Sequence, residues 1–126
     1  MDKNFSSSAI ESFLAFLRTA QDEYRRADLN EQESNAVTQD ILHSLELCKH
    51  SYHEYAKLSK GLGEVRRKRR DAKDTRTMLG PVAQWVEEHQ TLVKGIECLL
   101  GEVRKAERST QNRVYTPRTN FEEELL

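Results

Sequence analysis

The chain has few of the residues that interrupt regular structure, with two prolines and five glycines among 126 residues. An all-β fold needs a turn about every 10 residues, and such turns depend heavily on Gly and Pro. The scarcity of both therefore argues against an all-β protein and favours long helices. The length is that of a single domain.

Long apolar runs are missing as well. No stretch approaches the roughly 18 consecutive apolar residues that span a bilayer, and residues 1–8 lack the features of a secretory signal. Two cysteines, Cys48 and Cys98, do not make a disulfide framework. We therefore expect a cytoplasmic protein that makes no membrane contact.

Sequence motifs of enzymes and metal sites are also missing. The chain contains no G-x-x-x-x-G-K-[ST], G-x-G-x-x-G, G-x-S-x-G, H-E-x-x-H or C-x-x-C pattern. A helical chain of this size without a dense polar core is a poor host for an active site. We therefore expect a non-enzymatic protein with no catalytic residue, no metal and no cofactor.

The residues that are present follow helical periodicity. Hydrophobic residues make up 37% and charged residues 33%, a balance typical of helices that bury one stripe. The first predicted helix covers residues 8–27 and begins with the capping-box pair Ser8 and Glu11. Leu14 widens its apolar face, and its heptad seam consists of Ile10, Phe13, Leu17, Ala20, Tyr24 and Ala27.

A second helix is predicted over residues 30–78, with Asn30 as its N-cap. Its seam consists of Val37, Ile41, Leu45, Cys48, Tyr52, Tyr55, Leu58, Leu62 and Val65. Gly61 and Gly63 each cost roughly 1 kcal/mol inside a helix. The seam keeps its phase across them, so we predict that the helix continues to about Met78 and is broken by Gly80.

A third helix is predicted over residues 81–109, with Pro81 in its first turn. Its seam consists of Val82, Trp85, His89, Leu92, Ile96, Leu99 and Val103, and its face is widened by Val86, Val93 and Leu100. Residues 110–126 form a C-terminal tail, in which a last helical turn is expected from Phe121 to Leu126.

These patterns predict an all-α fold of three main helices in one domain, residues 1–109. The helices over 30–78 and 81–109 are expected to form a long antiparallel hairpin. At about 1.5 Å per residue, the helix over 8–27 is too short to cover it. Part of the seam is then exposed, and a homo-oligomer is its simplest cover. The alternative is a kink at Gly61–Gly63 that gives a compact four-helix bundle.

The strongest charge feature is the basic segment, residues 66–76. Seven of its eleven residues are cationic and two are anionic, whereas the whole chain sums to −1. A concentrated cationic block suits phosphates or an acidic protein surface, and arginine forks favour bidentate contacts. Ion pairs of Arg67 with Asp71 and of Arg70 with Asp74 are expected to neutralise part of it. The predicted ligand-binding residues are Arg66, Arg67, Arg69, Arg70 and Lys73.

Two other readings of the basic segment stay open at this point. One is a solvated helix face without a ligand. The other is a nuclear-localisation signal of the RRKRR kind, a pattern of low specificity.

Histidines form a second cluster in the sequence. His43, Glu46, His50 and His53 share one face of the predicted helix over 30–78, away from its seam. This face is either exposed and polar, or a partner contact, or a metal site across an oligomer interface. The chain lacks the Glu-x-x-His pairs of a di-iron bundle.

The tail carries a third candidate feature. Arg113, Tyr115 and Arg118 combine two cations with an aromatic ring, a set that can stack on and clamp a nucleotide. A tail packed on a neighbour, or a disordered tail, is the alternative. The acidic and apolar end, Phe121–Leu126, is a candidate to dock on another subunit's basic segment.

Three blocks, Thr38–His43, Tyr52–Leu58 and Glu64–Asp74, carry a family resemblance. Together they resemble small uncharacterised all-helical accessory proteins of phages and mobile elements. The resemblance implies a bacterial cytoplasm and an accessory role, such as countering host defence or regulating phage processes. It assigns no functional residue.

The sequence therefore predicts an oligomeric, non-enzymatic helical protein that binds an anionic ligand, either nucleic acid or a signalling nucleotide, through the basic segment. One alternative is an inhibitor or adaptor that binds a host enzyme acting on nucleic acid. Another is a structural coiled-coil component. Phosphate binding should weaken steeply with salt, which separates the first function from the other two.

Overall fold

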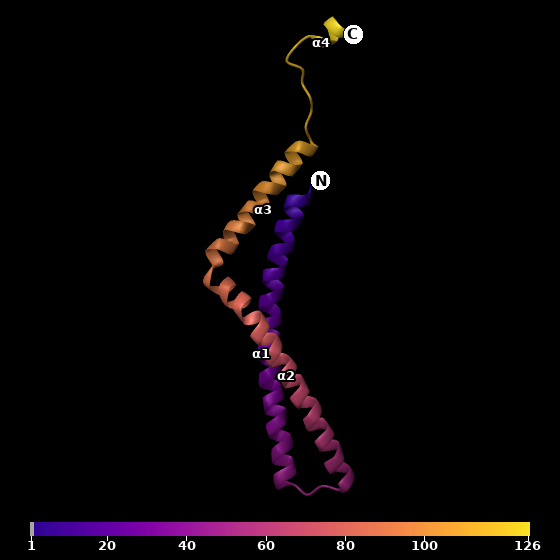
Figure 1. Cartoon of the computed structure of the whole chain (residues 1–126), viewed down its shortest axis with the longest axis vertical. Coiled ribbons are helices and arrows are strands. Elements are labelled where there is room, and N and C mark those ends of the chain that lie inside the picture. The colour runs from indigo at the N-terminus through magenta and orange to yellow at the C-terminus, as the bar shows by residue number, and fades with distance from the viewer. Residues whose placement is uncertain (1) are drawn as a thin grey trace.

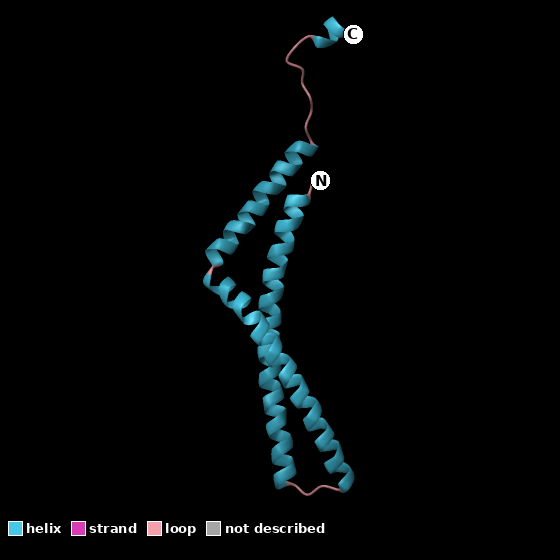
Figure 2. Ribbon diagram, in the orientation of Figure 1, coloured by secondary structure: helices cyan, strands magenta, loops and turns pink. Residues whose placement is uncertain are grey.

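The computed structural model describes residues 2–126, which form an all-α structure (Figure 2). Three main helices, α1 (Phe5–Leu47), α2 (Tyr52–Glu88) and α3 (Gln90–Gln111), are followed by the short α4 (Phe121–Leu125). The prediction of an all-α fold with three main helices and a long antiparallel hairpin is confirmed.

The molecule is an elongated hairpin of α1 and α2, and after a bend α3 continues in the general direction of α2, beside the N-terminal part of α1 (Figure 1). α1 and α2 pack antiparallel over most of their length, while α3 has a smaller interface with α1. The chain after α3 leaves the bundle and ends in α4, beyond the N-terminus of α1 (Figure 1). No helix within residues 2–126 is long and apolar enough to cross a lipid bilayer.

The predicted break at residues 28–30 is wrong, because α1 is continuous. This stretch contains neither Gly nor Pro, so remaining helical costs it little. Ala27 and Ser34 are buried and line the groove between α1 and α2. Packing against α2 therefore outweighs the local capping preference of Asn30.

The chain reverses at residues 48–51, inside the helix predicted over 30–78. The Oγ of Ser51 accepts a hydrogen bond from the backbone N–H of Glu54 at 3.2 Å and donates one to Glu54 Oε1 at 3.1 Å. These two residues form an S-x-x-E capping box at the start of α2. Cys48, which we placed on the predicted seam, is exposed at the end of α1.

The predicted breaker Gly80 and the predicted helix start at Pro81 both lie inside α2. Pro81 removes one backbone hydrogen bond. Ala83 and Val86 beyond it are buried, however, and their packing lets α2 continue as a helix past Pro81. The predicted pairing of 30–78 with 81–109 is therefore wrong, and the hairpin joins α1 and α2. The helix does continue through Gly61 and Gly63, as predicted, so the compact four-helix alternative is also wrong.

The chain bends at His89, between α2 and α3, and α3 continues in the general direction of α2 (Figure 1). Its Nδ1–H donates to the carbonyl oxygen of Trp85 at 2.7 Å, and its ring stacks on the Trp85 indole with centroids 4.5 Å apart. His89 thus closes the last turn of α2 with its own side chain, without a glycine.

The core is slender and built largely from small side chains. The buried apolar residues are Leu14, Leu17, Ala20, Ala27, Ala72, Ala83, Val86 and Leu100. Ser34 and Thr38 are buried beside them, and the Thr38 hydroxyl donates to the Ser34 carbonyl at 2.8 Å. Small residues let two helices approach closely, but they remove little apolar surface from water.

Polar contacts hold α3 against α1. Arg18 pairs with Glu97, and Glu11 pairs with Arg104, each at 3.2 Å. Nearer the N-terminus, a carboxylate on α3 accepts hydrogen bonds from the backbone N–H and the hydroxyl of Ser7, at 3.0 and 2.8 Å. The order of these contacts shows that α3 runs antiparallel to α1, because the residue numbers of the partners fall along α3 as they rise along α1.

Candidate functional site

The basic segment lies in the middle of α2, where Arg and Lys are good helix formers. Its only buried side chain is Ala72, which faces the groove between α1 and α2. The segment therefore packs on α1 through a small residue, and most of its long cationic side chains are exposed.

Helical rotation sorts these cations into two groups. Arg66, Arg69, Arg70 and Lys73, at positions i, i+3, i+4 and i+7, together line a shallow concavity of about 290 Å³. We call these four residues the cationic cluster. All four side chains are exposed. The cluster extends about 10 Å along the helix axis, at about 1.5 Å per residue.

The remaining cations of the segment face elsewhere. Lys68 and Asp71 line a separate groove of about 640 Å³ between α1 and α2. Arg76 Nε lies 2.8 Å from Glu31 Oε2 on α1. Its N–H is not aligned with that oxygen, so this contact is a close ion pair and not a hydrogen bond. Arg67 does not line the concavity of the cationic cluster.

The cationic cluster is not neutralised by neighbouring carboxylates. Among residues 2–126, no Asp or Glu oxygen lies within 4.0 Å of its charged groups. The expected ion pairs of Arg67 with Asp71 and of Arg70 with Asp74 are likewise not formed within this part of the chain. The cluster therefore presents four positive charges whose hydrogen-bond donors are free for a ligand.

The structure does not bring the tail residues to this cluster. Arg113, Tyr115 and Arg118 lie between α3 and α4, in the part of the chain that extends beyond the open end of the hairpin (Figure 1). All three are exposed. Within one copy of the chain, the predicted ligand-binding residues therefore divide into the cationic cluster, Arg67 elsewhere on α2, and the three distant tail residues.

The histidine cluster predicted on one helix face does not form. His43 and Glu46 belong to α1, His50 lies in the connection, and His53 belongs to α2. No group of three metal-ligating side chains comes together among residues 2–126.

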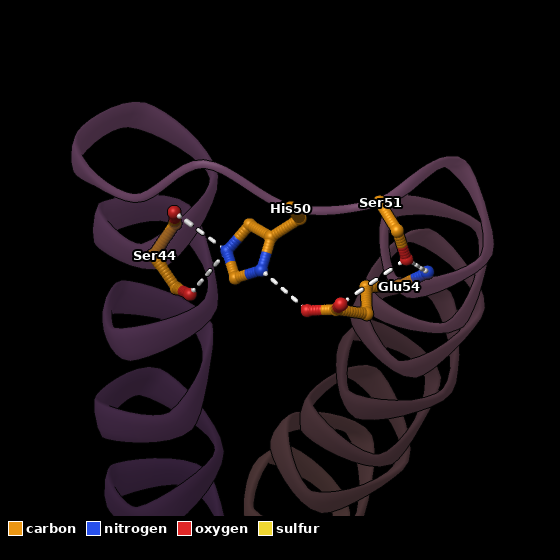
Figure 3. A network of polar contacts seen from close by, with 4 residues as sticks. All are labelled: Ser44, His50, Ser51 and Glu54. Atoms are coloured by element: carbon orange, nitrogen blue, oxygen red, sulfur yellow. Dashed lines mark hydrogen bonds and ion pairs between the residues drawn. The ribbon is translucent and has the colours of Figure 1, made fainter.

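His50 instead links the two ends of the hairpin connection (Figure 3). Its Nδ1 lies 3.1 Å from Glu54 Oε2, and its Nε2 lies 3.0 Å from Ser44 Oγ and 3.1 Å from the Ser44 carbonyl oxygen. Its ring and the Tyr55 ring form a T-shaped pair with a centroid distance of 5.2 Å. We did not predict this contact set, although the S-x-x-E pattern at residues 51–54 is a signal for it.

Glu54 is the acidic member of this network. Hydrogen bonds from His50 and from Ser51, in that order of size, hold the pKa of the Glu54 carboxyl below its ordinary value of 4.5. A lowered carboxyl pKa means that the ionised form stabilises the fold. This stabilisation is present above the ordinary pKa and is lost as the pH falls through the lowered one.

We expect Glu54→Gln to lower the melting temperature slightly at neutral pH, because the amide loses the charge that His50 and Ser51 stabilise. The difference from the wild type should persist down to about pH 4.5 and disappear as the pH falls further, when Glu54 itself becomes neutral. Thermal unfolding followed by circular dichroism over a pH series measures it. Glu46→Gln, an exposed carboxylate on α1, is the control. A difference that remains undiminished well below pH 4.5, where Glu54 is neutral, would contradict the assignment.

Comparison with known proteins adds no family. The chain matches no protein-family model, no curated protein and no solved structure. The resemblance to phage and mobile-element proteins therefore stays a prediction.

Proposed function

We propose that this protein is a non-catalytic binding module that holds the phosphate backbone of a nucleic acid through the cationic cluster, Arg66, Arg69, Arg70 and Lys73. The observation that carries the proposal is the composition of that surface. A single concavity is lined by four cations alone, in a chain whose net charge is −1.

The shape of the surface favours a polymer over a single nucleotide. Small-molecule sites are usually clefts that bury most of the ligand and are lined largely by apolar and aromatic groups. The cationic cluster is open, and no aromatic side chain lines it. It offers charge and hydrogen-bond donors for successive phosphates and nothing that reads a base, so binding should be independent of sequence.

Arginine makes up three of the four cluster residues. Its planar guanidinium donates two parallel hydrogen bonds to a phosphate, whereas lysine acts as a point charge. All four side chains of the cluster are exposed, so a strand can approach from solvent without displacing any packed element.

The test is a comparison of two double variants by fluorescence anisotropy, with a short labelled single-stranded oligonucleotide at low salt. Arg66→Gln with Arg70→Gln removes two cluster charges and should weaken binding on the order of tenfold, because two of the phosphate contacts are lost. Arg67→Gln with Lys68→Gln removes the same net charge from the same segment, outside the cluster, and should have a much smaller effect.

Equal losses in the two double variants would contradict a localised site and point to general charge attraction. Absence of binding by the wild type at low salt would overturn the proposal. Circular dichroism of both variants confirms that the helices are intact, which is expected because all four substituted side chains are exposed.

A further inference from the structure

The apolar seam predicted on the third helix is not the face that α3 buries. Leu92 is 55% exposed and Leu99 is 51% exposed, whereas Leu100, which only widened the predicted face, is 8% exposed. Ile96 and Val103, on the same seam, are half-buried. α3 thus uses one flank of its apolar surface against α1 and leaves the heptad seam partly exposed, most of all at Leu92 and Leu99.

The N-terminal part of α1 shows the same pattern. Phe13 lies four residues before the buried Leu17 and is therefore on the same face of the helix. Phe13 is 46% exposed, however, whereas Leu17 is 4% exposed. The apolar seam of α1 thus continues toward the N-terminus, past the region in which it is covered.

The two apolar seams, which are exposed at Phe13 on α1 and at Leu92 and Leu99 on α3, point to the same side of the molecule. On α1, Ile10 and Leu17 immediately precede Glu11 and Arg18, the residues that pair with α3. On α3, Ile96 and Val103 immediately precede the partners of those pairs, Glu97 and Arg104.

One residue is a rotation of about 100° in a right-handed helix. On both helices, the seam is therefore rotated in the same sense from the residues that pair α1 with α3. Because the helices are antiparallel, equal displacements place both seams on one side of the pair. α1 and α3 together form a two-helix layer with a continuous apolar face.

The chain exposes more surface than a compact monomer of its mass. The accessible surface is 10375 Å², whereas a compact monomer of 14.7 kDa exposes about 6,900 Å². A standard interface needs about 800 Å² from each partner. The excess belongs to the whole elongated chain, its tail included, and is larger than one such contribution.

We infer that this face, Ile10, Phe13, Leu92, Ile96, Leu99 and Val103, is a homodimer interface that packs against the same face of a second copy. The face is self-complementary, since it is apolar throughout and carries no charge that would repel its copy. Its spacing of four and three residues along α3 is that of a seam which packs against another helix. Two such layers related by a two-fold axis form a four-helix bundle.

The test is the molar mass in solution, measured by light scattering or sedimentation equilibrium over a concentration series. The wild type should have twice the 14.7 kDa of one chain. Leu99→Glu should weaken dimerisation by at least roughly 100-fold, because the interface would bury an unpaired charge. Cys98→Glu adds the same charge at the neighbouring exposed residue, which faces away from the seam, and should leave the dimer intact.

Both substituted residues are exposed in the monomer, so the helical circular dichroism signal should not change in either variant. A wild-type protein that remains monomeric throughout the series would overturn the inference. So would a Leu99→Glu variant that dimerises as well as the wild type. The inference is independent of the proposed ligand, because the cationic cluster is not part of this face.

Discussion

Leu17→Ala is expected to lower the free energy of unfolding by roughly 2–5 kcal/mol, the range for a buried Leu replaced by Ala. Leu17 is 4% exposed, and half of the buried apolar residues among those described are alanines. The few larger side chains, chiefly Leu14, Leu17 and Val86, therefore supply much of the apolar burial. A domain is stabilised by only about 5–15 kcal/mol in total, so this one change removes a large fraction.

The matched control is Leu29→Ala in the same helix. Leu29 is 64% exposed, and a substitution there should change the free energy of unfolding by no more than about 0.5 kcal/mol. Urea unfolding of both variants, followed by circular dichroism at one protein concentration, gives the comparison. Equal losses would mean that the face of α1 described as buried is not the one that packs.

Gly61→Ala combined with Gly63→Ala is expected to raise the free energy of unfolding by about 1–2 kcal/mol. Both glycines lie inside α2, and the chain has no glycine with a positive φ within residues 2–126. A methyl group at Gly61 would meet nothing within 4 Å, and one at Gly63 would make an ordinary contact of 3.9 Å with Arg67. Each replacement therefore gains most of the helix propensity that separates Ala from Gly, roughly 1 kcal/mol.

Thermal unfolding of the double variant measures this gain. The same two residues would act differently as a hinge, because Ala would then restrict a conformation that the fold requires. A lower melting temperature in the double variant would therefore contradict a continuous α2.

The type and number of the helices could be predicted from the sequence because periodicity is a local property. Their boundaries depended on competing signals of similar strength. Asn30 is a good cap but lies where α1 packs on α2, and Pro81 is a good first residue but lies where α2 is held by Ala83 and Val86. The capping box at Ser51 marks the start of α2 after the chain reversal. We instead followed the apolar seam and predicted one helix across this point.

The choice of buried face could not be predicted from spacing alone. The seam through Leu92 and Leu99 and the flank through Leu100 are both apolar. Only the position of α1 shows that the flank is buried and the seam is not. The four residues of the cationic cluster, in contrast, follow from spacing, since any helix over residues 66–73 places them on one flank. The distance of Tyr115 from that cluster, by contrast, follows from the path of the whole chain.

The most direct test of the proposed function is the salt dependence of wild-type binding to a short single-stranded oligonucleotide. If the cationic cluster contacts four phosphates, the logarithm of the association constant should fall linearly with the logarithm of the salt concentration, with a slope of about −2.8, since each phosphate contact contributes about −0.7 for single strands. A slope near zero, or no binding at low salt, would contradict phosphate binding by this surface.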